Sequence, residues 1–266
     1  MKDNIVKILL LVLILVVPIY NLCGLLADEM VVSSVEIDDA VIGEISSLKS
    51  KDIEKKINSL INARQEKREK ERLEQERKEN YERIEKQIRS GKINFKRELA
   101  DTLIVGDSLM NALELYDIID DANIISKVSA NFQHLEECYA TIVSNNPKTL
   151  VLHYGINMCE NSDDRRAAFV SQYTDILERL IKDIPDTKIY ISGIFNVSSS
   201  AAEKFPCVAD YNNEIKAMCK KLGINYLDNS KCFTGDESFY GTDGIHLKKE
   251  FYSEYWIPNL LLTFYA

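Results

Sequence analysis

The sequence has no excess of positive charge and no closely spaced pair of cysteines. Lysine and arginine total 33 against 42 aspartate and glutamate residues, for a formal net charge of −9. Binding to a phosphate backbone needs the opposite balance, which argues against nucleic acid as a partner. The six cysteines form no CxxC pair. We therefore expect no metal site, and we assign most of the cysteines a buried, structural role.

Charged residues are also absent from positions 8–27, which read ILLLVLILVVPIYNLCGLLA. About 20 such residues can cross the ~30 Å hydrocarbon core of a membrane as a helix. Two lysines precede the run, and Asp28 and Glu29 follow it. The positive-inside rule then predicts that residues 1–30 are a single-pass transmembrane signal anchor at the cell membrane, with everything after them extracytoplasmic. A cleaved signal peptide and a lipoprotein signal at Cys23 remain open as alternatives.

Glycine and proline are missing from residues 47–90, and the segment RQEKREKERLEQERKE within them is almost entirely charged. Opposite charges recur four residues apart, as in Lys67 and Glu71, which supports a solvated helix. An apolar seam begins at Ile53 and Ile57 but is polar in its middle. Residues 31–92 are therefore predicted to be a charged helical stalk, either a single helix or a weak coiled coil that could make a homodimer.

The pattern changes after Asn94 to short apolar runs separated by amphipathic segments, which is typical of an α/β fold. The expected domain covers residues 93–266, with three layers around a parallel, flavodoxin-like sheet. The predicted strands are 102–105, 123–128, 149–154, 188–194 and 225–227. The predicted helices are 109–119, 133–144, 165–182, 208–222 and 248–264.

Polar residues follow the predicted strands, where sites form in open α/β sheets. Gly106, Asp107 and Ser108 lie between the first strand and its helix. A serine at a helix N-terminus has free backbone N–H groups beside it that can stabilise a developing oxyanion. The alternative interpretation is that Asp107 or Ser108 only caps the helix.

The second motif is GTDGIHL, near the C-terminus. Asp243 and His246 are three residues apart across a glycine-containing turn. This spacing can place the carboxylate against one imidazole nitrogen and leave the other nitrogen for a serine hydroxyl. Alone, the pattern is common, and His246 could be a partly buried loop residue.

Together, the Gly-Asp-Ser motif, the YGINM segment and the terminal Asp-x-x-His motif resemble the SGNH or GDSL hydrolase family over residues 98–266. The resemblance implies that Ser108 is the nucleophile, His246 the general base and Asp243 the residue that orients it, with no cofactor. It also implies an oxyanion hole made of the Ser108 N–H, the N–H of the second family block and the Asn157 side chain.

The chain departs from the family pattern at two positions. By its spacing to Leu135, Ser129 stands where the second block has glycine, with Ala130 as the alternative, so the N–H can serve only if the backbone there fits that turn. Met158 replaces the aspartate that follows the block asparagine, which affects loop geometry and substrate more than the triad. Asp107, Gly155 and Asn196 are weaker candidates for substrate binding.

The two remaining histidines are assigned no catalytic role. His134 lies on a predicted helix and is expected to be exposed. His153 ends a predicted strand and is expected to be a hydrogen-bonded structural residue.

Three functions remain in competition. The first is hydrolysis of acyl esters, acetyl above all, on cell-envelope carbohydrate through an acyl-enzyme. The second is O-acyl transfer to a cell-wall or capsular glycan with the same triad. The third is a catalytically weak binding or scaffold module, which the altered second block and Met158 would favour.

Overall fold

The computed structural model describes residues 50–266. The predicted membrane anchor at 1–30, and the predicted stalk up to residue 49, lie outside the described residues. Within the described part, no helix has the length and apolar character needed to cross a membrane. The chain divides into two compact units between Glu74 and Gln75, and each is described by itself.

Helix α3 covers Ser50–Arg89 and is strongly polar. In the first unit its charged side chains are exposed and pair along the helix, as Arg72 does with Glu69. In the second unit the helix contributes to the core, because Ile84 is fully buried. Arg83 donates two hydrogen bonds to the Glu98 carboxylate, which fixes this part of α3 to the short helix α4 (Phe95–Glu98). The second compact unit, Gln75–Ala266, includes this C-terminal part of α3.

Five parallel strands form one sheet in the order β2-β1-β3-β4-β5. This is the doubly wound, flavodoxin-like order. The strands are β1 (Thr102–Gly106), β2 (Ile124–Ser126), β3 (Thr149–His153), β4 (Lys188–Ser192) and β5 (Asn225–Leu227). The three central strands are rich in Val, Ile and Leu and almost wholly buried, as expected for a sheet covered on both faces. The predicted α/β class is confirmed.

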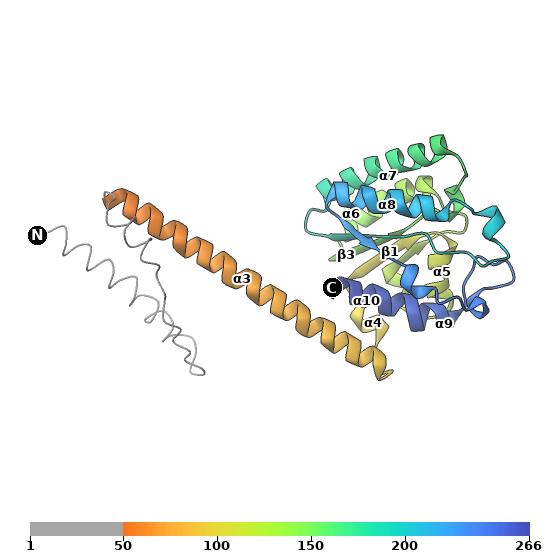
Figure 1. The fold of residues 1–266 in the computed structure, drawn as a ribbon, viewed down its shortest axis with the longest axis horizontal. Helices are drawn as coiled ribbons and strands as arrows, with labels where there is room; N and C mark the ends of the chain where they lie inside the picture. The colour runs from red at the N-terminus through yellow and green to blue at the C-terminus, as the bar shows by residue number, and fades with distance from the viewer. Residues whose placement is uncertain (1–49) are drawn as a thin grey trace, which may run out of the picture. The chain divides into compact units, whose positions relative to one another are not determined.

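The main helices pack in two layers on the sheet (Figure 1). One layer holds α6 (Phe132–Asn145), α7 (Asp163–Asp183) and α8 (Val208–Leu222). The other holds α5 (Ser108–Leu115) with α9 (Lys249–Phe251) and α10 (Ile257–Tyr265). Most predicted element boundaries agree within two residues, although β2 is shorter and α5 ends four residues earlier.

The last helix differs from the continuous one that the sequence predicts. Residues Tyr252–Trp256 form a π-helical turn between α9 and α10. Tyr252 and Trp256, at the two ends of this turn, are both fully buried, and the Tyr252 hydroxyl donates to Leu109 O at 2.7 Å. The C-terminal segment is thereby joined to α5, the helix that carries Ser108.

Candidate active site

Ser108 is the first residue of α5, directly after β1. The backbone passes so close to its neighbours here that a side chain on Gly106 would collide with the His153 carbonyl and with Met110. Asp107 caps the helix by accepting a hydrogen bond from Leu109 N–H at 2.9 Å. The Ser108 side chain is half-buried at the carboxyl edge of the sheet.

Asp243 and His246 lie in a tight turn before α9. Asp243 Oδ1 accepts hydrogen bonds from the backbone N–H groups of Ile245 and His246, at 2.9 and 3.0 Å. Gly244 has φ 70° and packs so closely on Ser198 and Ser200 that a larger residue would clash. The turn therefore holds the carboxylate in one orientation relative to the imidazole ring.

The structure brings the three predicted catalytic side chains into one hydrogen-bonded chain. His246 Nδ1 lies 2.5 Å from Asp243 Oδ2, and His246 Nε2 lies 2.9 Å from Ser108 Oγ. Nδ1–H then donates to the carboxylate and leaves Nε2 to accept the serine proton. About half of the His246 and Asp243 side-chain surface is exposed, so the triad is accessible from solvent.

The environment of Asp243 favours its ionised form. Partial burial would raise its pKa, but the hydrogen bonds from Ile245 N–H and His246 outweigh burial and lower the pKa to about 2. The group is thus a carboxylate at neutral pH, as orienting and stabilising an imidazolium requires.

The predicted oxyanion-hole residues lie on neighbouring loops. Ser129 has φ 57°, the left-handed conformation that a glycine would adopt without strain. Asn157, in the 3₁₀ turn Ile156–Met158, donates its side-chain Nδ2 to Ala130 O at 3.0 Å. This bond joins the second and third motif loops. It also uses only one of the two amide hydrogens, and the other stays free to donate to an oxyanion.

Two of the weaker substrate-binding assignments do not agree with the structure. The Asp107 side chain is fully buried as the cap of α5, so it cannot contact a substrate. Gly155 is also buried, with φ 144° and Ile194 against the position of a side chain, so it shapes the loop. Asn196, by contrast, is exposed after β4 and remains a candidate.

The other two histidines are both internal. His153 is buried, bonds to Ser192 Oγ at 2.9 Å, and has its pKa lowered to about 3 by burial, which agrees with a structural role. His134 is also buried, so the expectation of an exposed residue was wrong. Its Nδ1 lies 2.8 Å from the Tyr154 hydroxyl across α6 and β3. Residues 50–266 contain no cluster of three or more side chains suited to a metal ion.

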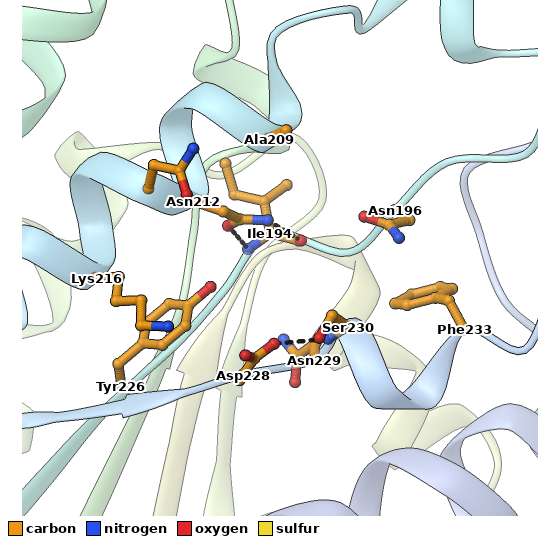
Figure 2. Close-up of a pocket in the computed structure, with 11 residues that line it drawn as sticks. Ile194, Asn196, Ala209, Asn212, Lys216, Tyr226, Asp228, Asn229, Ser230 and Phe233 are labelled. Carbon is orange, nitrogen blue, oxygen red and sulfur yellow. Dashed lines mark hydrogen bonds between the residues drawn. The ribbon is translucent and has the colours of Figure 1, made fainter.

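Two cavities, of about 240 and 200 Å³, lie at the ends of β4 and β5. Asn196 and Phe233 line both of them. The second cavity is also lined by Tyr240 and Leu247, and Leu247 directly follows His246 of the candidate triad. Figure 2 shows the first cavity, with Lys216 and Tyr226 facing Asn196 and Phe233. Of the residues that line the first cavity, the sequence indicated only Asn196, because the others lie on α8, on β5 and in the loops after β4 and β5, where no motif marks them.

No family model and no curated protein matches the chain. The chain is similar to solved structures, among them a protein from Parabacteroides merdae assigned as a GDSL-like lipase, with 11% identity, 62% of this chain and 95% of that chain covered, and a TM-score of 0.49. A GDSL-like lipase from Bacteroides thetaiotaomicron is 13% identical, with 69% of this chain and 95% of that chain covered and a TM-score of 0.47. A variant of an acetyl xylan esterase from Geobacillus stearothermophilus is 11% identical, with 61% of this chain and 90% of that chain covered and a TM-score of 0.44. These structural neighbours are GDSL-like lipases and an acetyl xylan esterase, each at 11% to 13% sequence identity.

Proposed function

We propose that the chain is a serine-dependent ester hydrolase that removes acyl groups, acetyl above all, from carbohydrate through an acyl-enzyme. The single observation that carries the proposal is the continuous arrangement of Ser108 Oγ, His246 and Asp243. Both links of this arrangement, from Ser108 to His246 and from His246 to Asp243, are within hydrogen-bond reach without any rearrangement.

In the first half-reaction, Ser108 Oγ attacks the ester carbonyl while His246 Nε2 takes its proton. Asp243 holds the imidazole in the tautomer that can accept this proton and stabilises the positive charge that develops on the ring. The imidazolium then gives the proton to the leaving sugar oxygen, which departs as an alcohol and leaves the acyl group on Ser108.

Negative charge develops on the carbonyl oxygen in both half-reactions. Three groups are available to bind it: the Ser108 N–H at the start of α5, the Ser129 N–H and the free amide hydrogen of Asn157. Donors of this kind are each worth about 10²- to 10³-fold in rate. In the second half-reaction, His246 activates a water that releases the acid and restores Ser108.

The proposed location is the outer face of the cell membrane, with residues 1–30 as the anchor and α3 as part of a spacer. This follows from the apolar run at 8–27 and the charges on either side of it. An anchored enzyme is suited to a substrate fixed in the cell envelope. The acetyl xylan esterases among the structural neighbours act on an acylated carbohydrate, which is consistent with that substrate class.

The test is release of p-nitrophenol from p-nitrophenyl acetate by the full chain, beside its Ser108→Ala variant and with or without an oligosaccharide acceptor. We expect turnover that is lost in the variant and is unaffected by the acceptor. Acceptor-dependent acceleration with acylated sugar as product would assign acyl transfer instead. Equal rates for both proteins would reject the proposal.

A further inference from the structure

The cavity of about 240 Å³ at the ends of β4 and β5 has a composition that restricts what it can bind. It contains one cation, Lys216, and one carboxylate, Asp228, whose pKa is lowered by hydrogen bonding to Ser230 despite partial burial. The other polar groups are amides and hydroxyls. The cavity is therefore close to neutral, and an uncharged ligand rich in hydroxyl groups suits it better than a phosphate or another strongly charged molecule.

Some of the polar lining is already engaged in holding the fold. Asn212 accepts a hydrogen bond from Ile194 N–H and donates one to Ile194 O (Figure 2). Asn229 donates to Ser192 Oγ and to Gly193 O. These two amides fix the segment after β4, so the base of the cavity is rigid.

Other polar groups of the lining are available to bind a ligand. Within residues 50–266, the side chains of Asn196 and Asn213 and the Tyr226 hydroxyl have no hydrogen-bond partner. Gly193 makes room for that hydroxyl, because a side chain there would collide with it. Burial, with the nearby Asp228 charge, raises the pKa of Tyr226 to about 12, so the group stays a hydrogen-bond donor. Amide and phenol groups together offer the donors and acceptors that vicinal hydroxyls need.

An aromatic ring lies on each of two opposite sides of the cavity, Tyr226 on one and Phe233 on the other (Figure 2). Lys216 Nζ lies 5.9 Å from the centre of the Tyr226 ring, and Phe233 faces this pair across the cavity (Figure 2). Aromatic walls with a few convergent polar groups are typical of sites that bind a small ring with polar edges.

The cavity is connected to the catalytic loop. Tyr240 donates from its hydroxyl to Asn196 O at 3.0 Å and pairs with Leu247, the residue after His246. Asn196 and Phe233 then form the wall shared with the first cavity. A substrate held in both cavities would thus extend from the triad along the ends of β4 and β5.

We propose that this first cavity is a subsite for a sugar unit of the substrate, bound through Tyr226, Asn213, Lys216 and Asn196 at a distance from the scissile ester. This inference rests on the proposed carbohydrate-ester function and adds to it the residues that would recognise the glycan. It makes the length of the oligosaccharide a determinant of activity, because a substrate that ends at the ester cannot reach the subsite.

The test compares kcat/KM for O-acetylated xylotriose and O-acetylated cellotriose with that for p-nitrophenyl acetate. The variants are Tyr226→Phe and Asn213→Ala, and the matched control is Lys221→Ala, an exposed lysine on α8 outside the cavity. The quantity compared is the ratio of kcat/KM for a trisaccharide to kcat/KM for p-nitrophenyl acetate. For at least one trisaccharide, this ratio should fall about five- to tenfold in both variants, as expected for one lost hydrogen bond. The fall should come from a higher KM for the trisaccharide. The control should keep the wild-type ratio, and melting temperatures should verify that all variants fold.

The two proposals fail in different ways. A wild-type ratio in both variants, with Ser108-dependent turnover intact, would overturn the subsite and leave the hydrolase. If Ser108→Ala shows that no turnover depends on the serine, the hydrolase fails. The subsite is then tested by itself, by calorimetric binding of xylotriose and cellotriose to the wild type and to Tyr226→Phe. Weaker binding to the variant supports the subsite. No binding, or equal binding to both proteins, rejects it.

Discussion

Asp107 stands next to Ser108, in a buried environment that disfavours its charged form. One carboxylate oxygen caps α5, whereas Oδ2 is buried without a partner among the described residues. Burial raises the pKa of Asp107 to about 7, against the lowering effect of the bond from Leu109 N–H. The carboxyl that positions Ser108 therefore changes charge near neutral pH.

Protonation of Asp107 stabilises the folded state. The folded state binds the Asp107 proton more tightly than the unfolded state does. The contribution of Asp107 to the free energy of unfolding is therefore full below pH 4 and is lost as the pH rises towards 7. The loss is at most about 4 kcal/mol, at about 1.4 kcal/mol per unit of pKa. Asp107→Asn keeps the capping oxygen, so its free energy of unfolding should vary less between pH 5 and 8 in urea titrations. An identical pH profile for wild type and variant would contradict this.

Ser129 occupies a glycine-type conformation, with φ 57°. A non-glycine residue there costs roughly 1 to 2 kcal/mol, which glycine avoids at some cost in chain entropy. Ser129→Gly should therefore leave kcat/KM within about twofold and raise the free energy of unfolding by up to about 1 kcal/mol. Urea unfolding and ester kinetics measure both. A loss of activity of tenfold or more would mean that the serine side chain itself takes part in catalysis.

At the scale of elements, the loop that carries Asn157 lies against the start of α8 through two thiols. Cys159 Sγ and Cys207 Sγ are 3.5 Å apart, in the reduced state. Tyr211 reinforces the contact by donating to Met158 O at 3.2 Å. Burial raises the pKa of Cys159, which makes its reaction slow.

We expect a disulfide donor such as oxidised glutathione to link these two thiols, with release of two reduced glutathione molecules. In the chain-entropy model, closing this loop stabilises the fold by roughly 4 kcal/mol before any strain. Peptide mapping by mass spectrometry should find the Cys159–Cys207 link in the wild type and not in Cys207→Ser. Exclusive modification of another cysteine, such as the partly exposed Cys138, would contradict the expectation.

The elements were also the part of the structure that sequence periodicity predicted best. The strands β1, β3 and β4 are short, continuous apolar runs, and α7 and α8 have clear amphipathic patterns with capping residues at one end. The π-helical turn at Tyr252–Trp256 could not be predicted, because its apolar residues fit an ordinary helix equally well. The burial of His134 depends on the Tyr154 hydroxyl, a partner contributed by another element.

At the scale of the whole molecule, the motifs of the candidate triad were identifiable because each is local: a strand-to-helix turn at Ser108 and a three-residue spacing from Asp243 to His246. Ser108 and His246 are 138 residues apart in the sequence, and they meet because of the order of the strands in the sheet. The motifs themselves do not specify that order. The cavity residues Lys216 and Tyr226 were not found, because they meet only after α8 packs beside β5 and neither belongs to a motif.

The part of α3 from Gln75 onward belongs to the C-terminal unit, and Ile84 is its fully buried residue. Ile84→Ala should lower the free energy of unfolding by about 2 to 5 kcal/mol, as for other deletions of buried methyl groups. Leu73→Ala is the matched control, because Leu73 is half exposed, and it should change stability by less than about 0.5 kcal/mol. Guanidinium titrations of both variants check this. Equal effects would show that the helix does not stabilise the unit through Ile84.

The central claim is that Ser108 is an activated nucleophile, and covalent labelling tests it most directly. The full chain is treated with a fluorophosphonate, and the modified peptide is identified by mass spectrometry. We expect one phosphonylated residue, Ser108, with labelling abolished in Ser108→Ala and slowed about 10³-fold or more in His246→Ala. Absence of labelling, or labelling that persists in Ser108→Ala, would contradict it.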